Sequence, residues 1–340
     1  MKILLFLFSI IYAAISSLRN FLFDIGIFRA KSFSIPIICI GNLNVGGSGK
    51  TPHTDYIFKI LAHKKVAIIS RGYRRKSKNL YSVKIDSDFN MVGDEPLMLK
   101  RKNPNALVIV CANRVKAINH IIKNHNEIEV ILLDDGFQHR WVKAGLNILL
   151  SSFHKPFYKD YLLPYGHLRE NKKQSRRANY VITTNIEHNL ENDEIQNIKK
   201  EISKFSQAKS SFSRVKYLKP KNIFNNEIFD INGYHIILIS GIANTTSLIK
   251  HIKTQSTIIK HFEFKDHHNY IKEDIKNILF YCDSIKSTKK IILTTEKDSV
   301  KLVQFKEDFK NMEVVFLPIE IKILDQGEFN QKIIRYVDGN

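Results

Sequence analysis

Short apolar runs separated by polar stretches recur along most of this chain, with a spacing typical of alternating strands and helices. Five short, mainly apolar runs in the first half predict buried strands. They lie at Ile35–Ile40, Lys65–Ser70, Ala106–Val110, Glu129–Leu133 and Leu146–Leu150, with helices expected at Pro52–His63 and Arg114–Asn124. This order predicts a mostly parallel sheet covered by helices on both faces, with functional residues at the carboxyl ends of its strands.

A second alternation of the same kind follows beyond residue 205. Strands are expected at His235–Ser240, Thr257–His261 and Lys290–Thr294, and helices at Thr246–Thr254 and Lys272–Tyr281. The polar, helical stretch Asn185–Lys204 separates the two alternations and indicates a change of domain. We therefore expect an N-terminal helix within residues 1–30, a larger α/β domain over 31–205 and a smaller α/β domain over 206–340.

Two apolar stretches open the chain, Ile3–Ile15 and Leu18–Phe28. A cleaved signal peptide would use Lys2 as its basic region and Ala13-Ala14 as a weak cleavage site. A membrane span normally needs about 20 apolar residues, more than the first stretch provides. A buried core helix is a further alternative. We favour an interfacial helix that lies in the membrane plane, since basic residues just downstream suit an anionic surface.

A glycine-rich turn follows the first predicted strand directly. Residues 41–52 read Gly-Asn-Leu-Asn-Val-Gly-Gly-Ser-Gly-Lys-Thr-Pro, and Asn44 replaces a glycine of the generic phosphate-loop pattern. The glycines allow a tight turn that aims backbone N–H groups inward, and the following helix adds its positive dipole end. Lys50 can reach the β- and γ-phosphates of a nucleotide, and the Thr51 hydroxyl can bind Mg²⁺. The predicted nucleotide-binding residues are Asn44, Val45, Gly46, Gly47, Ser48, Gly49, Lys50 and Thr51.

Two adjacent acidic residues, Asp134 and Asp135, end the strand expected at Glu129–Leu133. Buried carboxylates at such a position are unfavourable unless a cation compensates their charge. A carboxylate beside the start of a P-loop helix holds Mg²⁺, directly or through water. We therefore predict a metal site formed by Thr51, Glu95, Asp134 and Asp135.

A second acidic pair, Asp94 and Glu95, stands at a predicted helix start. Asp94 could cap that helix. If the nucleotide donates its γ-phosphate to a hydroxyl, the hydroxyl needs a proton acceptor, and a nearby carboxylate fits this role. The sequence Asp266-His267-His268 in the second domain adds a histidine that can tune or relay a proton. Adjacent histidines converge poorly on one ion, so a zinc site is disfavoured.

Basic residues outnumber acidic ones by 53 to 33, which gives a net charge of +20. Such a charge favours an anionic partner: a nucleotide, a nucleic acid or an acidic membrane surface. The basic residues are scattered rather than striped and form no motif with interleaved aromatic residues, which argues against nucleic acid. Arg71 follows a predicted strand end, where a guanidinium can grip phosphate bidentately. The three cysteines lie far apart in apolar runs and are expected to be buried thiols.

Together and in this order, the motifs resemble those of one family, the tetraacyldisaccharide 4'-kinases (lipid A 4'-kinases) of Gram-negative bacteria. The shared segments span positions 41 to 298. Besides the P-loop they are Ser70-Arg71-Gly72-Tyr73, Gly93-Asp94-Glu95-Pro96, Leu133-Asp134-Asp135-Gly136-Phe137-Gln138-His139, Leu163-Pro164…Gly166…Leu168-Arg169-Glu170, Phe264…Asp266-His267 and Thr294-Thr295-Glu296-Lys297-Asp298. The chain departs from the family at Thr245, where proline is usual, and at Arg74, where a small residue is common.

The resemblance implies a P-loop NTPase-like domain and a smaller α/β domain joined by a hinge, with a membrane-associated N-terminal helix. It implies transfer of the ATP γ-phosphate, with Mg²⁺, to the 4'-hydroxyl of a tetraacylated glucosamine disaccharide 1-phosphate. Asp94 would accept the proton, supported by His267, with Glu95, Asp134 and Asp135 around Mg²⁺. The residues expected near the lipid head group or the phosphates are Arg71, His139, Arg169 and Glu170. We expect a monomer bound peripherally to the cytoplasmic face of the inner membrane, with a lipid substrate and no nucleic acid.

A regulatory nucleotide-binding switch is the main alternative class. The guanine-recognition motif Asn-Lys-x-Asp is absent, and Thr295-Glu296-Lys297-Asp298 matches it only in part. A switch would bind or hydrolyse nucleotide without forming a phosphorylated lipid. Transfer of label from ATP to the lipid therefore separates the two classes.

Overall fold

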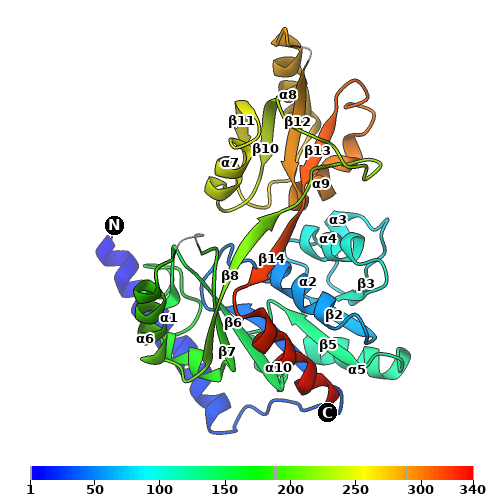
Figure 1. Cartoon of the computed structure of the whole chain (residues 1–340). Helices are drawn as coiled ribbons and strands as arrows, with labels where there is room; N and C mark the ends of the chain where they lie inside the picture. Colours follow the sequence, from blue (N-terminus) through cyan, green and yellow to red (C-terminus); the bar gives the residue numbers. More distant parts are fainter. Residues whose placement is uncertain (1, 187–189, 288, 340) are drawn as a thin grey trace.

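The computed structural model describes residues 2–186, 190–287 and 289–339, which form two α/β domains, each built on its own sheet (Figure 1). The predicted α/β fold with an N-terminal apolar helix is confirmed. In Figure 1 the smaller sheet stands above the larger one, and strands β8 (Lys209–Tyr217) and β14 (Ile319–Ile323) run side by side between them. The long helix α1 (Lys2–Asp24) lies at the outer edge of the larger domain in Figure 1.

The larger sheet has nine strands, and all neighbouring pairs are parallel except β3–β4 and β14–β8. Their order is β14 (Ile319–Ile323), β8 (Lys209–Tyr217), β7 (Tyr180–Thr184), β6 (Leu146–Ser152), β1 (Ile37–Asn42), β5 (Val130–Asp134), β2 (Val66–Ser70), β4 (Leu107–Val110) and β3 (Tyr81–Ser82). The helices of this domain are α1 (Lys2–Asp24), α2 (Lys50–Ile60), α3 (Phe89–Val92), α4 (Asp94–Lys102), α5 (Arg114–Asn124), α6 (Asn192–Ser203) and α10 (Gln326–Asp338), with 3₁₀ turns η1 (Phe157–Lys159) and η2 (Lys172–Arg177).

The smaller sheet has five strands, and only β9 runs antiparallel to its neighbour. Their order is β11 (Thr257–Glu263), β10 (His235–Ser240), β12 (Lys290–Thr295), β13 (Val314–Leu317) and β9 (Lys221–Asn222). Its helices are α7 (Thr246–Ile252), α8 (Lys272–Ser284) and α9 (Glu296–Leu302), with the 3₁₀ turn η3 (Val303–Phe305). Below, residues 221–317 are called the smaller domain.

The larger sheet is buried on both faces, which explains why its central strands are apolar at successive positions. In β1, Ile38 and Ile40 join the core cluster that also contains residues of α2, α4 and α10. Ile37 and Cys39 point to the opposite face and join the cluster beneath α5. Because side chains alternate along a strand, a continuous apolar run is needed to supply both cores. The three cysteines are buried and unpaired, as predicted.

The sheets divide the chain differently from the expected boundary at residue 206. β8 lies in the larger sheet, and the chain returns to that sheet with β14 and α10 after the smaller domain is complete. Ile321 and Ile323 of β14, with Phe329 and Ile333 of α10, are buried in the core of the larger domain. The two domains are therefore joined by two adjacent connections. The polar stretch expected around 185–204 contains α6, while its residues 187–189 lie outside the described residues.

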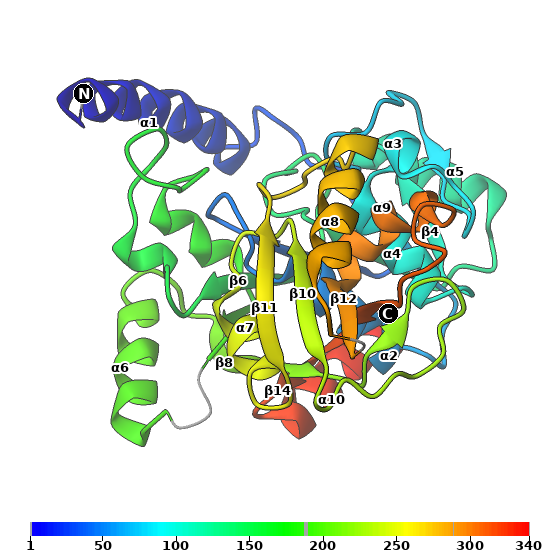
Figure 2. The same cartoon turned by 90° about the horizontal axis from the view of Figure 1, so that it is seen from above.

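Helix α1 exposes most of its apolar side chains and buries only a narrow face, which includes polar residues and Phe23. Ser9 and Asn20 are buried against the larger domain, whereas Leu7, Ile11 and many similar residues are more than half exposed. Within the described part of the chain, Ile3–Asp24 alone is long and apolar enough to cross a membrane, by length and composition only. Its N-terminal end projects away from both sheets (Figure 2). This exposure excludes the alternative of a buried core helix.

Candidate active site

The glycine-rich turn leads from the end of β1 into α2, as expected for a P-loop. Gly49 has a φ of 79°, a left-handed conformation that glycine adopts without strain, and it precedes the first residue of α2. A neighbouring segment anchors the turn from outside. The N–H of Val45 donates to the carbonyl oxygen of His167 at 2.7 Å, and the Asn44 side chain donates to Asp160 Oδ2 at 2.8 Å. Asn44, which replaces a glycine of the generic pattern, thus fixes the loop through its side chain.

The P-loop forms one wall of a cavity of about 500 Å³ between the two domains. Residues of the smaller domain form the opposite wall. From the larger domain the cavity is lined by residues 44–52 with Ser70, Arg71, Tyr73, Arg74, Glu95, Asp135 and Arg169, and from the smaller domain by Ile242, Ala243, Asp266, His267 and Lys297. The predicted phosphate-binding and catalytic segments therefore converge on one space.

Two carboxylates lie behind the P-loop at the end of β5. Asp134 is buried and accepts a hydrogen bond from the Thr54 hydroxyl at 3.1 Å. Burial, with the nearby charges of Glu95 and Asp135, raises the pKa of Asp134 to about 7. Burial also opposes ionisation of Asp135, but Lys50 and Arg169 hold its pKa at about 2. The Lys50 Nζ lies 3.9 Å from Asp135 Oδ1.

These carboxylates fit a divalent cation. Burial, and then the neighbouring charges of Glu95 and Asp135, disfavour the ionised form of Asp134, and a bound cation would offset this. Among the described residues, no three His, Cys, Asp or Glu side chains form a preassembled metal site. A cation would therefore also need the Thr51 hydroxyl and oxygen ligands from a bound nucleotide.

Asp94 and His267 meet across the domain boundary, at the edge of the cavity. Asp94 is the first residue of α4, and His267 lies on the loop after β11 with a left-handed φ of 59°. The His267 Nδ1 is 3.0 Å from Asp94 Oδ2 and 3.2 Å from Oδ1. Burial would raise the pKa of Asp94, but the His267 hydrogen bond and the Lys297 charge lower it well below its usual value. His267 lines the cavity, and Asp94 beside it is 7 % exposed.

Two lysines of α9 surround this pair, although no sequence motif indicated a role for either of them. Lys297 Nζ lies 3.0 Å from His267 Nε2, 3.0 Å from Asp266 Oδ1 and 3.5 Å from Glu95 Oε1. Burial opposes the Lys297 charge, but these carboxylates raise the pKa of its ammonium group. Lys301, one helical turn further, is 3.5 Å from Asp94 Oδ2. The spacing of the two lysines, i and i+4, is the one sequence signal that could have grouped them.

The four residues expected near the substrate occupy two different environments. Arg71 and Arg169 line the cavity, and Arg169 Nη2 lies 2.9 Å from Asp135 Oδ1. His139 and Glu170 do not line it. Burial, followed by the charge of Arg114, lowers the pKa of His139 to about 4, and its Nε2 has no hydrogen-bond partner among the residues that the structure describes.

Glu170 lies beneath α1 and is 1 % exposed. Its carboxylate is 2.6 Å from Arg177 Nη2 and accepts a 3.0 Å hydrogen bond from Asn20 of α1. The hydroxyl of Tyr12, also on α1, donates to the carbonyl oxygen of Arg169 at 2.9 Å. The segment that carries Arg169 and Glu170 is thus tied to the N-terminal helix.

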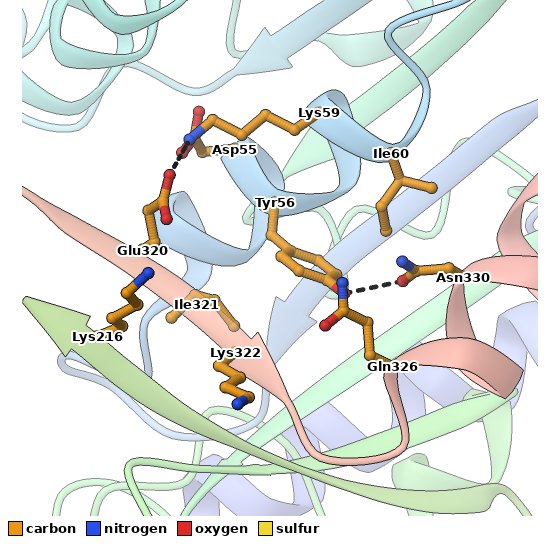
Figure 3. A pocket seen from close by; sticks show the side chains of 10 residues that line it. All are labelled: Asp55, Tyr56, Lys59, Ile60, Lys216, Glu320, Ile321, Lys322, Gln326 and Asn330. Atoms are coloured by element: carbon orange, nitrogen blue, oxygen red, sulfur yellow. Dashed lines mark hydrogen bonds and ion pairs between the residues drawn. The ribbon is translucent and has the colours of Figure 1, made fainter. Parts of the chain in front are cut away.

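Two further cavities lie near α2. One of about 230 Å³ adjoins the P-loop and has a mainly apolar lining that includes Val215, Tyr217, Ile242 and Leu317. The other, of about 520 Å³, lies between α2, β8, β14 and α10 (Figure 3). There Lys59 is paired with Asp55 and Glu320, and no P-loop residue lines the space. Of these two cavities, only the apolar one adjoins the P-loop, so only it can hold part of a molecule that also occupies the P-loop.

Comparisons with known proteins show the family of this chain. The family model of tetraacyldisaccharide-1-P 4'-kinase matches residues 1–338. The tetraacyldisaccharide 4'-kinase of Bacteroides thetaiotaomicron is 38 % identical, covering 97 % of this chain and 92 % of that protein. The tetraacyldisaccharide 4'-kinase of Flavobacterium psychrophilum is 37 % identical, and the match covers 99 % of this chain and 97 % of that protein. The crystal structure of "apo" form LpxK from Aquifex aeolicus in complex with ATP has a TM-score of 0.77 and 30 % identity, covering 99 % of each chain. The chain therefore belongs to the tetraacyldisaccharide-1-P 4'-kinase family.

Proposed function

We propose that this enzyme transfers the γ-phosphate of ATP to the 4'-hydroxyl of tetraacyldisaccharide 1-phosphate, a step of lipid A biosynthesis. The relatives carry the name of this activity, and the similar crystal structure contains ATP. One observation carries the proposal: a P-loop from the larger domain faces His267 of the smaller domain, which is hydrogen-bonded to Asp94, across one cavity.

The nucleotide phosphates would lie on the backbone N–H groups of residues 44–51, with Lys50 at the β- and γ-phosphates. Lys50 now faces Asp135, so it would exchange part of that contact for phosphate oxygens. Mg²⁺ would take the Thr51 hydroxyl, with Asp134, Asp135 and Glu95 around it, and would neutralise charge that develops on the γ-phosphate. The apolar cavity beside Gly47 and Gly49 would receive the base.

Asp94 would act as the base. The 4'-oxygen forms a bond to the γ-phosphorus while the bond to the leaving ADP oxygen breaks, and the hydroxyl proton passes to the Asp94 carboxylate. The lowered pKa of Asp94 keeps it ionised before the reaction. Because Asp94 and His267 belong to different domains, closing of the domains would assemble the pair and exclude water, which otherwise competes as acceptor.

The acceptor lipid would stay in the membrane while its sugar head group enters the cavity. Arg71 and Arg169 line that space and suit a phosphate or sugar oxygen. His139 and Glu170, which do not line the cavity, would support these two arginines from the side away from it. The exposed apolar face of α1 would lie in the cytoplasmic leaflet of the inner membrane, with the protein bound peripherally as a monomer.

The test is an incubation of the purified protein with γ-labelled ATP, Mg²⁺ and tetraacyldisaccharide 1-phosphate in detergent micelles. Labelled lipid is the expected product, and it should be lost in Asp94→Asn and Lys50→Met. ATP consumed without labelled lipid would instead support a nucleotide switch. Omission of Mg²⁺ should abolish transfer.

A further inference from the structure

His53 lies beneath the P-loop and joins it to a strand that leads to the smaller domain. Its side chain is buried, with Nδ1 2.7 Å from the carbonyl oxygen of Gly49, the last residue before α2. On the other side of the ring, Nε2 lies 2.9 Å from the hydroxyl oxygen of Ser213 in β8. Ser213 is also fully buried and is paired with Ile323 of β14. The imidazole therefore bridges the phosphate-binding turn and the two strands that connect the domains.

The Gly49 carbonyl group determines which imidazole nitrogen of His53 carries the hydrogen. A carbonyl oxygen only accepts hydrogen bonds, so Nδ1 must be the protonated nitrogen. Burial lowers the pKa of His53 to about 4, so the ring is neutral at pH 7 and Nε2 keeps its lone pair. The Ser213 hydroxyl can rotate to donate to that lone pair. Ser213 thus favours the one neutral form of the ring that can donate to the P-loop.

This hydrogen bond fixes the orientation of the peptide unit that joins Gly49 to Lys50. The Gly49 oxygen accepts from Nδ1 and also from the backbone N–H of His53 at 3.1 Å, so it points along α2. In a trans peptide unit the carbonyl oxygen and the next N–H point in opposite directions. The Lys50 N–H therefore points back toward the glycine-rich turn, and no acceptor in the described part of the chain receives it. A phosphate bound at the start of α2 would approach from this side.

We propose that His53 is a positioning residue of the P-loop, which holds the Gly49 carbonyl along α2 and thereby aims the Lys50 N–H at the nucleotide phosphates. Ser213 acts through His53, because it fixes the tautomer of the imidazole. The generic phosphate-loop pattern ends at Thr51 and gives position 53 no role. This inference rests on the proposed function only in placing the phosphates of ATP on the P-loop.

The test compares ligands with and without phosphates in the full-length protein. The dissociation constants of ATP with Mg²⁺ and of adenosine are measured by competition against a fluorescent ATP analogue. His53→Leu keeps a side chain of similar size but donates no hydrogen bond to Gly49. ATP should therefore bind about 2- to 12-fold more weakly, as expected for one net hydrogen bond. Adenosine has no phosphate, so its affinity should be unchanged.

Two further variants distinguish the nitrogen that faces Gly49 from the nitrogen that faces Ser213. His53→Asn places an amide group near the position of Nδ1 and should restore most of the ATP affinity. His53→Gln places its amide group near the position of Nε2 and should not restore it. His63→Leu is the matched control, because it makes the same change at an exposed position shortly after α2. This control should bind ATP as the wild type does.

Three outcomes would overturn the proposal. ATP binding that His53→Leu leaves unchanged would show that the loop does not need the imidazole. Equal weakening of ATP and adenosine would indicate a general packing defect. If the variants fail to fold, long-range nitrogen–proton correlation spectra of the isotope-labelled wild type are decisive: a protonated Nδ1 is expected for His53, and an Nε2–H tautomer would contradict the proposal.

Failure of this inference can be distinguished from failure of the proposed function. A wild-type protein that binds no ATP would refute the proposed function. A wild-type protein that binds ATP and phosphorylates the lipid, with no phosphate-dependent change in His53→Leu, would refute only the role of His53.

Discussion

Asp94 and His267 are separated by 173 positions in the sequence, yet Nδ1 of the histidine lies 3.0 Å from a carboxylate oxygen of the aspartate. Beside this contact, α9 of the smaller domain packs against α4 of the larger one. Asp94→Asn keeps the shape of the side chain but removes the base, so kcat should fall by about 10²- to 10⁴-fold. The melting temperature should change little by comparison.

A double variant tests whether the two residues act as a unit. If His267 acts only through Asp94, Asp94→Asn/His267→Asn should be no slower than Asp94→Asn alone. Additive losses in steady-state lipid phosphorylation would show that the two residues contribute independently. Nucleotide affinity, measured by calorimetry, should be similar in all three variants, since neither side chain belongs to the P-loop.

Arg74 crosses between the domains and should support closure. Its Nη1 lies 3.3 Å from the carbonyl oxygens of both Asp266 and His267. Arg74 has a left-handed φ of 59°, so Arg74→Gly removes the side chain without backbone strain. At about 0.5–1.5 kcal/mol per net hydrogen bond, loss of the two bonds should lower kcat/KM by about 5- to 160-fold.

Arg75 provides the matched control for Arg74. It donates to the Ser77 hydroxyl and to the carbonyl oxygen of Asn79, all within the larger domain. Arg75→Ala therefore removes a neighbouring arginine without a contact to the smaller domain. Equal losses of kcat/KM in the two variants would argue against a specific effect of the crossing contact.

His53 should make the stability of the protein depend on pH. It is buried beneath the P-loop, where Nδ1 contacts the Gly49 carbonyl oxygen at 2.7 Å and Nε2 contacts the Ser213 hydroxyl at 2.9 Å. Burial lowers its pKa to about 4, although the bond to Gly49 opposes this. Between about pH 6.5 and 4 the unfolded chain therefore binds the extra proton, and stability falls as the pH decreases through this range.

The measurement is the free energy of unfolding against pH for the wild type and His53→Asn. The variant should lose less stability between pH 6.5 and 4, by up to about 3 kcal/mol. His63→Asn, at an exposed position of the same segment, is the control and should follow the wild type. Parallel pH profiles of the wild type and His53→Asn would contradict a neutral buried His53.

The exposed apolar face of α1 should bind membranes. Leu7 and Ile11 are 53 % and 57 % exposed and lie one turn apart. Leu7→Asp/Ile11→Asp should lower binding to anionic vesicles at least about tenfold, since each large apolar side chain contributes about 1.5–3 kcal/mol when buried. Phosphorylation of vesicle-borne lipid should decline in parallel, while ATP binding stays unchanged.

Phe280 provides the control for α1. It lies on α8 of the smaller domain and is 79 % exposed, so it is at least as accessible as the residues of α1. Phe280→Asp should leave co-sedimentation with vesicles unchanged. An equal loss for Phe280→Asp and the α1 variant would show that general surface hydrophobicity, not α1, mediates adsorption.

The local sequence was sufficient to predict the elements whose apolar pattern is continuous. β1, β5 and β10 each contain an unbroken apolar run because both faces of each sheet are covered. The P-loop is specified within a few residues by glycine, lysine and threonine. β8 was missed, since it buries Ser211 and Ser213 where an aliphatic pattern is expected. The return of β14 and α10 to the larger sheet was also missed, because strand pairing between distant segments leaves no local signal.

The amino-acid sequence by itself determined the alternating α/β order, the phosphate-binding turn, the acidic pair that ends β5 and the apolar N-terminal helix. Each of these depends on neighbouring residues and on the period of a single element. Only the tertiary structure decided that Lys297 meets Nε2 of His267, that Arg74 reaches the loop of the smaller domain, and that Glu170 lies under α1. Those contacts depend on how two domains dock and where a helix packs, which is set by burial of surfaces far apart in the sequence.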